Sequence, residues 1–254
     1  MLKAFFTRPL AAVFFLIAAL LTQTAAAQDP AQLDPHHVQV LLENERVRVL
    51  RLSVPPREAI PPYDAPATAE IFFRDAHLRY LVPGRANNKE EQIPGRAVRF
   101  SRGESKRGLE NLSDTTLEIV AIEFKDKLPK KNPGFPGDRD PAILDPGQFK
   151  QELVNEWCRV IDFHVGPREA VPMSLHPGRV VIALSDGNYR LIRPKYGTTI
   201  VDAKAGEISW RPAELAAIES SSDHIVEELF IEPRPYDLGP YAPREPVKPV
   251  TRRK

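Results

Sequence analysis

Apolar residues in this chain alternate with polar ones or form short runs between turn residues, a pattern typical of β-strands. Two clear examples are 47–54 and 159–165, each of which ends at a Pro-Arg-Glu turn. Further strands are predicted at 69–74, 77–82, 97–100, 117–124, 179–184, 188–193, 207–210 and 225–231. The only helical turn that we expect lies around 148–154. Many short strands at this spacing predict an all-β chain built as a sandwich or barrel.

The chain also contains an internal repeat with a shift of 111 residues. Leu33-Asp34-Pro35 returns as Leu144-Asp145-Pro146, and the Pro-Arg-Glu-Ala segment at 56–59 returns at 167–170. The Asn-Glu-Xaa-Xaa-Arg-Val motif at 44–49 returns at 155–160, and the same shift matches Arg79 with Arg190 and Gly95 with Gly206. Several motifs with one offset indicate a duplicated domain.

The repeat defines the expected domain organisation. We predict two similar barrels at 28–124 and 144–232. A linker rich in proline, glycine and lysine joins them at 125–143, and a proline-rich tail follows at 233–254. Proline and glycine at this density interrupt strands and helices, so both segments are expected to be extended or irregular.

Residues 1–27 have the features of a cleaved secretory signal peptide. Lys3 and Arg8 precede an apolar run from Leu10 to Leu21, and small residues at 25–27 suit signal peptidase. A helix of that run would rise only about 18 Å, whereas a bilayer core is roughly 30 Å thick. We therefore expect a secreted or periplasmic chain that starts at Gln28 and is not an integral membrane protein after cleavage. An uncleaved N-terminal anchor is the alternative.

Charge and motif content exclude several classes of function. The chain has 35 Lys and Arg against 34 Asp and Glu, so it does not have the basic surface that nucleic-acid binding requires. Cys158 is the only cysteine, which rules out an intramolecular disulfide, and its apolar neighbours predict a buried thiol rather than a nucleophile. No phosphate-binding loop, serine nucleophile elbow or Cys-Xaa-Xaa-Cys pair is present.

Three segments of the second half resemble the conserved blocks of the cupin superfamily. They are 167–177, which includes Met173-Ser174-Leu175-His176-Pro177, the hairpin Leu184-Ser185-Asp186-Gly187, and 205–213 around Trp210. The resemblance covers most of 33–124 and 144–232, and it is to the small two-domain cupins of bacteria. It implies two tandem double-stranded β-helix (jelly-roll) barrels. Such barrels commonly pair through edge strands, which makes a homodimer a candidate assembly.

The resemblance also locates the positions of a cupin metal site in the second barrel. That site takes a His-Xaa-His pair and a following Glu from the first block and a third His from the second, a ligand set that suits divalent metals. In the second barrel the histidine positions fall on Ser174, His176 and Ala216. Only one of the three residues can bind a metal.

The first barrel departs from the pattern further. Its histidine positions fall on Tyr63, Ala65 and Lys106, while Glu70 takes the position of the Glu. The resemblance therefore predicts no metal cofactor, because one histidine or one carboxylate does not form a tight site. A divalent metal held through His176 is the alternative.

Two further residues are candidates for a pocket. His164 lies near the end of a predicted strand and would form a two-histidine site with His176 if it points into the second barrel. Trp210 resembles a barrel-lining aromatic residue of cupins, for which we favour core packing over ligand stacking.

These observations favour an exported cupin-like protein without a complete metal site, acting as a small-molecule-binding or structural module. The alternative is a metal-dependent cupin enzyme, such as a dioxygenase, isomerase or epimerase, that uses His176 with further ligands. A third hypothesis is a protein that docks partners on its exposed barrel edges. We assign no catalytic residues.

Overall fold

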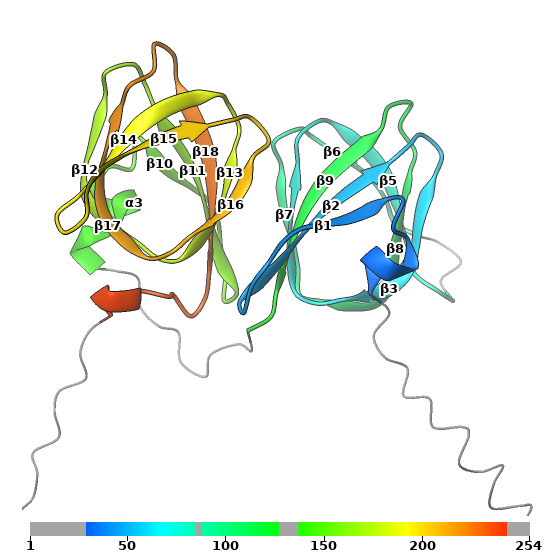
Figure 1. The fold of residues 1–254 in the computed structure, drawn as a ribbon. Coiled ribbons are helices and arrows are strands. Elements are labelled where there is room, and N and C mark those ends of the chain that lie inside the picture. Colours follow the sequence, from blue (N-terminus) through cyan, green and yellow to red (C-terminus); the bar gives the residue numbers. More distant parts are fainter. Residues whose placement is uncertain (1–28, 85–87, 127–136, 243–254) are drawn as a thin grey trace, which may run out of the picture.

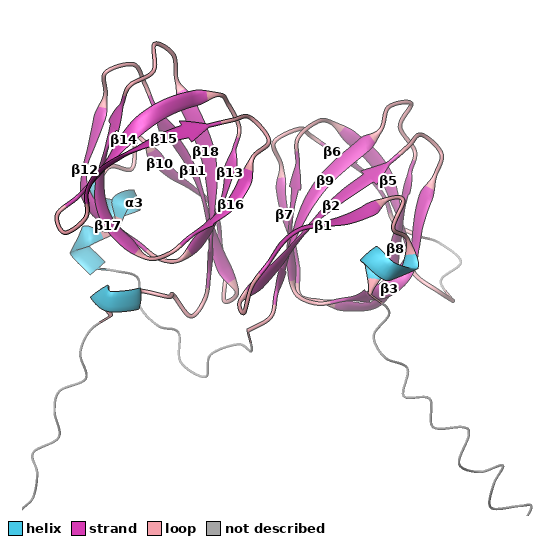
Figure 2. Ribbon diagram, viewed as in Figure 1, coloured by secondary structure: helices cyan, strands magenta, loops and turns pink. Residues whose placement is uncertain are grey.

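The computed structural model describes residues 29–84, 88–126 and 137–242, and it is made almost wholly of strands (Figure 2). The strands form two barrels that lie side by side, the first coloured blue to green and the second green to orange (Figure 1). The predicted signal peptide and the end of the tail from residue 243 lie outside the described residues. Within those residues, no helix is long and apolar enough to cross a membrane.

The first barrel consists of two antiparallel sheets. One sheet has five strands in the order β1-β2-β9-β4-β7, and the other has four in the order β3-β8-β5-β6. Their bounds are β1 (Val38–Glu43), β2 (Val47–Val54), β3 (Ala59–Ala65), β4 (Thr68–Phe72), β5 (Ala76–Leu81), β6 (Glu90–Ile93), β7 (Val98–Ser101), β8 (Glu104–Asn111) and β9 (Leu117–Phe124).

The second barrel repeats this arrangement strand for strand. Its sheets have the orders β10-β11-β18-β13-β16 and β12-β17-β14-β15. Their bounds are β10 (Phe149–Val154), β11 (Cys158–Val165), β12 (Ala170–His176), β13 (Arg179–Ala183), β14 (Gly187–Arg193), β15 (Gly197–Ala203), β16 (Ile208–Arg211), β17 (Glu214–Ser220) and β18 (Val226–Pro233). The prediction of an all-β chain with two jelly-roll barrels is confirmed.

Some predictions of detail are wrong. The segment expected as a helical turn, 148–154, forms strand β10. Helical turns occur instead within the predicted linker, as η1 (Gly137–Arg139) and α3 (Pro141–Leu144). The predicted tail also begins as part of the fold, because Tyr236 is only 9% exposed and η2 (Gly239–Tyr241) follows it. In each case proline starts or flanks a short helical turn that the composition of the segment did not reveal.

The shift of 111 residues does not extend along the whole repeat. The Arg96 amide donates to the Phe72 carbonyl, and the Gly206 amide donates to the Ala183 carbonyl in the equivalent turn. Gly206 therefore corresponds to Arg96 rather than to Gly95. Both residues have positive φ, 84° and 66° respectively, which glycine adopts at less cost than arginine.

Each barrel starts with the same capped helical turn. In the first barrel, the Asp29 side chain caps α2 (Pro30–Leu33) and forms an ion pair with Arg48 at 2.7 Å. In the second, Asp140 caps α3 and forms an ion pair with Arg159, also at 2.7 Å. An aspartate at the N-cap satisfies a free backbone amide and interacts favourably with the helix dipole. The repeat therefore begins at Asp29, before the first motif that the sequence comparison detected.

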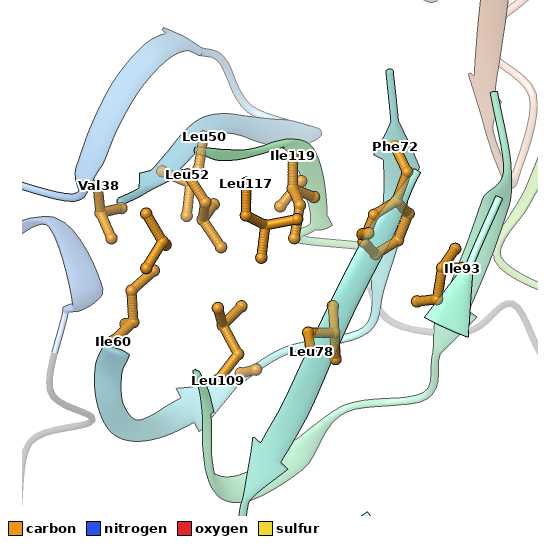
Figure 3. Packing of buried hydrophobic residues seen from close by; sticks show 14 of the residues in the cluster. Val38, Leu50, Leu52, Ile60, Phe72, Leu78, Ile93, Leu109, Leu117 and Ile119 are labelled. Carbon is orange, nitrogen blue, oxygen red and sulfur yellow. The ribbon is translucent and has the colours of Figure 1, made fainter. Parts of the chain in front are cut away.

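Three apolar cores stabilise the molecule. One fills each barrel, and in the first barrel Leu78 and Leu109 of one sheet face Leu52 and Leu117 of the other (Figure 3). A third core lies between the barrels, where the outer faces of β2, β9 and β4 pack against those of β11, β18 and β13. Cys158 belongs to this third core, and burial raises the pKa of its thiol to about 12. The predicted buried position of the thiol is confirmed.

Candidate functional site

An ion pair occupies the interior of the first barrel. Glu70 on β4 accepts a hydrogen bond from the Arg107 guanidinium on β8, and the two side chains are only 5% and 11% exposed. The same guanidinium lies 5.0 Å from the centroid of the Tyr80 ring, in the range of a cation-π contact. The carboxylate that the resemblance placed at a metal position is therefore neutralised by an arginine.

Tyr63 lies beside this pair. It is opposite Arg107 in the pairing of β3 with β8, and it is 6% exposed. Burial, reinforced by the nearby charge of Glu70, raises the pKa of its phenol, so Tyr63 stays protonated and neutral. The position predicted for a histidine thus holds a core residue.

Lys106 is not at the interior position that the sequence assigned to it. Arg107 is opposite Tyr63, as Ala216 is opposite Ser174 in the second barrel, so Arg107 is the structural equivalent of Ala216. Lys106 lies outside, with its side chain 46% exposed and its amine 3.7 Å from a carboxylate oxygen of Asp64. Successive residues of a strand face opposite sides, so a difference of one residue moves a side chain out of the barrel.

In the second barrel, His176 is fully buried and lies in an aromatic cage. Its Nε2 atom is 3.0 Å from the Ser174 hydroxyl, and its ring lies 5.7 Å from that of Phe149 and 6.1 Å from that of Phe230. Burial and, next, the charge of Arg179 hold the pKa of His176 well below its usual value. The imidazole is therefore neutral.

These residues do not fit a divalent metal. Ser174, Ala216 and Val181, which takes the place of Glu70, add no strong ligand to His176. Across residues 29–84, 88–126 and 137–242, no three His, Cys, Asp or Glu side chains are grouped as a metal site would need.

His164 and Trp210 face away from the second barrel's interior. Phe163 and Val165, the neighbours of His164, both belong to the barrel core, so His164 between them points outward. The predicted pairing of His164 with His176 is therefore wrong. Trp210 packs against the core between the barrels. Its role is in core packing, as favoured, but outside the barrel rather than in its lining.

The first barrel has a cavity of about 360 Å³ next to the Glu70–Arg107 pair. Its lining comes from the ends of β4 to β8 and comprises Glu70, Tyr80, Val82, Asn88, Lys89, Glu91, Arg99, Phe100, Ser101 and Arg107. The volume is within the range of small-molecule sites.

The second barrel has a cavity of about 490 Å³ at the equivalent mouth, since Leu191 and Val201 take the places of Tyr80 and Glu91. Its lining is more apolar, with two tyrosines, Tyr196 and Tyr241. Both of its arginines are paired: Arg193 with Glu214 at 2.7 Å, and Arg211 with Glu228 at 2.9 Å. The two mouths therefore correspond in position and differ in chemistry.

Behind this mouth the second barrel is filled by buried ion pairs. Arg159 bonds Asp140 and Glu232, and Arg179 bonds Glu214, all with side chains exposed by 9% or less. Burial alone would raise the pKa of the Glu214 carboxyl, but its ion pairs with Arg179 and Arg193 hold it below its usual value. Each charge in this group has an opposite neighbour, so the group offers no unpaired charge to a ligand.

Comparison with solved structures identifies the fold. No family model matches the chain, and no curated protein does. A single-residue variant of oxalate decarboxylase from Bacillus subtilis aligns over 76% of this chain and 71% of its own with a TM-score of 0.53 and 10% identity. The chain has the two-barrel cupin fold. Procruciferin, an 11S globulin from Brassica napus, aligns over 80% of this chain and 85% of its own with a TM-score of 0.51 and 9% identity.

Cupin folds thus include both an oxalate decarboxylase and a globulin, so the fold alone does not select a function. Sequence reasoning missed Arg99, Arg107 and Tyr80, because none of them is a residue type that the cupin metal motif contains. The signal that would have found Arg107 is the alignment of Glu110 with Glu219, which reveals a two-residue deletion in the second half.

Proposed function

We propose that this protein is an exported, two-barrel binding module that takes up a small molecule in the cavity of the first barrel without using a metal. The observation that carries the proposal is the Glu70–Arg107 ion pair at the wall of that cavity. The pair replaces the metal-binding chemistry of the position, while the concave space of about 360 Å³ beside it is kept.

The second barrel supports the first in this proposal. Its interior is filled by paired charges and by the cage around His176, and the core between the barrels fixes the two halves together. The ion pair of Arg96 with Glu227, 3.2 Å long, and that of Arg102 with Glu156, 2.8 Å long, add polar contacts across the same boundary. A rigid scaffold of this kind positions a pocket well.

The alternative, a metal-dependent cupin enzyme, would need ligands beyond His176. Oxalate decarboxylase shares the fold but only 10% of its residues, which is too little to transfer its activity to this chain.

The proposal is tested by screening a metabolite library for ligands that raise the melting temperature of mature protein. A ligand of the first cavity should lose its effect in Val82→Trp, which places an indole at the cavity rim. Elemental analysis of the same protein gives the metal content. Stoichiometric metal, together with ligands that bind only the metal-loaded form, would overturn the proposal in favour of the enzyme.

A further inference from the structure

We infer that the ligand of the first cavity carries one anionic group, a carboxylate or a phosphate, and that Arg99 binds it. This inference rests on the proposed function, because it names the chemical class of the molecule bound in that cavity.

The first step is the charge balance of the cavity wall. Two carboxylates line the cavity, and both are already paired, Glu70 with Arg107 and Glu91 with Lys89. Arg99 is the remaining charged residue of the lining. In the part of the chain that the structure describes, no carboxylate lies within ion-pair distance of Arg99, whose side chain is exposed. The wall therefore has one uncompensated positive charge.

The second step is the supply of hydrogen-bond donors. The Asn88 side-chain oxygen accepts from the Val82 amide at 3.0 Å, which leaves the Asn88 NH2 group to donate elsewhere. The Ser101 oxygen accepts from the Gly103 amide at 3.4 Å, which leaves its hydroxyl proton available. Burial raises the pKa of Tyr80, so its phenol also remains a donor.

Donors and a cation without matching acceptors favour an anion. Arginine binds carboxylate and phosphate groups through two parallel hydrogen bonds, and such charge-assisted bonds are stronger than neutral ones. The Tyr80 ring, beside the Arg107 guanidinium, gives the rest of the ligand an aromatic surface to contact.

The second barrel provides an internal comparison. There Ser209 takes the place of Arg99, and Arg211 takes the place of Ser101. Arg211 is bound to Glu228, so the equivalent mouth has no unpaired arginine among its lining residues. The uncompensated cation is thus a property of the first barrel and not of the shared fold.

The test measures binding of paired probes to mature protein by calorimetry and NMR. The probes are acetate, benzoate and succinate, their neutral amides, and inorganic phosphate. We expect at least one anion to bind while its amide does not, with backbone amide shifts at residues 80–82 and 99–101. Arg99→Gln should weaken binding by roughly tenfold or more, which is the scale of a charge-assisted hydrogen bond. Arg74→Gln is the matched control, because Arg74 is exposed and lies outside the cavity lining.

The outcomes separate the two proposals. Amides that bind as tightly as their acids, with binding lost in Val82→Trp and unchanged in Arg99→Gln, would overturn the anion and keep the cavity. Binding of no probe, with no shift at residues 80–82 or 99–101, would overturn the anion, and the library screen would then decide the cavity alone. Binding of phosphate without any carboxylate would support the inference and identify a phosphate as the anionic group.

Discussion

The Arg107 guanidinium bonds the Glu70 carboxylate inside the first barrel, and neither side chain is more than 11% exposed. A carboxylate at this depth needs a cation to offset its loss of hydration. In the second barrel the equivalent residues are Ala216 and Val181, which are both apolar. The two barrels therefore solve the same position in two ways, each of which leaves no net buried charge.

Removing Arg107 alone should unfold the first barrel more easily. We expect Arg107→Met to cost about 3 kcal/mol, because it leaves Glu70 buried without its cation. The double variant Glu70→Met with Arg107→Met should recover most of that loss, since no charge then remains. Urea denaturation of the three proteins measures this. A double variant as unstable as the single one would show that the pair acts through packing instead.

The repeat provides a matched pair of capping residues. Asp140 is 2% exposed, whereas Asp29 is 28% exposed, although both cap a helical turn and pair with an arginine. Asp140→Ala leaves Arg159 buried with one carboxylate fewer, so we expect a loss of about 3 kcal/mol. Asp29→Ala should cost about 1 kcal/mol, the value of an exposed cap. Equal losses in thermal denaturation would contradict the role of burial.

Stability should fall as the pH rises from about 5 to 8, in part through Glu123. Burial raises the pKa of Glu123 to about 7 against the pull of Arg48, which is 3.8 Å away; Asp29 and Glu43 reinforce the rise, and Lys125 opposes it. The folded state then holds a proton that the unfolded state releases above an ordinary pKa of 4.5. The stability from this proton is present below pH 4.5 and is lost as the pH rises through 7.

Glu123→Gln removes this titration. Chemical denaturation at several pH values should show a flatter profile for the variant and a gain of up to about 3 kcal/mol at pH 8 relative to wild type. Glu118→Gln, on the same strand but hydrogen-bonded to the Ser53 hydroxyl at 2.7 Å, is the control and should keep the wild-type slope. Parallel profiles for wild type and Glu123→Gln would rule out this carboxyl as the source.

The mature protein should begin at Gln28. Asp29 already caps α2 and binds Arg48, so cleavage after Ala27 leaves the whole first repeat intact. Expression in a bacterial host with mass spectrometry of the exported fraction measures the N-terminus. Detection of residues 1–27 on the exported protein would favour an uncleaved anchor.

The fold is predictable from the sequence because strand alternation and the repeat are local and periodic signals. The site is less accessible. Lys106 is assigned to the interior only when the shift of 111 residues is applied across a deletion, and one residue decides which face of a strand a side chain occupies. His164 is a different case, because the core positions of Phe163 and Val165 already follow from alternation and place it outside. Arg99 could not be identified, because an unpaired charge is a property of neighbours distant in sequence.

His176 provides the last prediction, because the sequence and the structure give different expectations for it. Counting metal ligands alone predicts that His176→Ala changes stability by no more than about 1 kcal/mol. The ring is fully buried between Phe149 and Phe230 and bonds Ser174, so its removal leaves a cavity and an unpaired hydroxyl. From the structure we expect a loss of about 2–4 kcal/mol with no change in metal content. His164→Ala, on the outer face, should cost less than about 1 kcal/mol. A metal that is lost with His176, measured by elemental analysis beside the denaturation curves, would instead identify this histidine as a ligand.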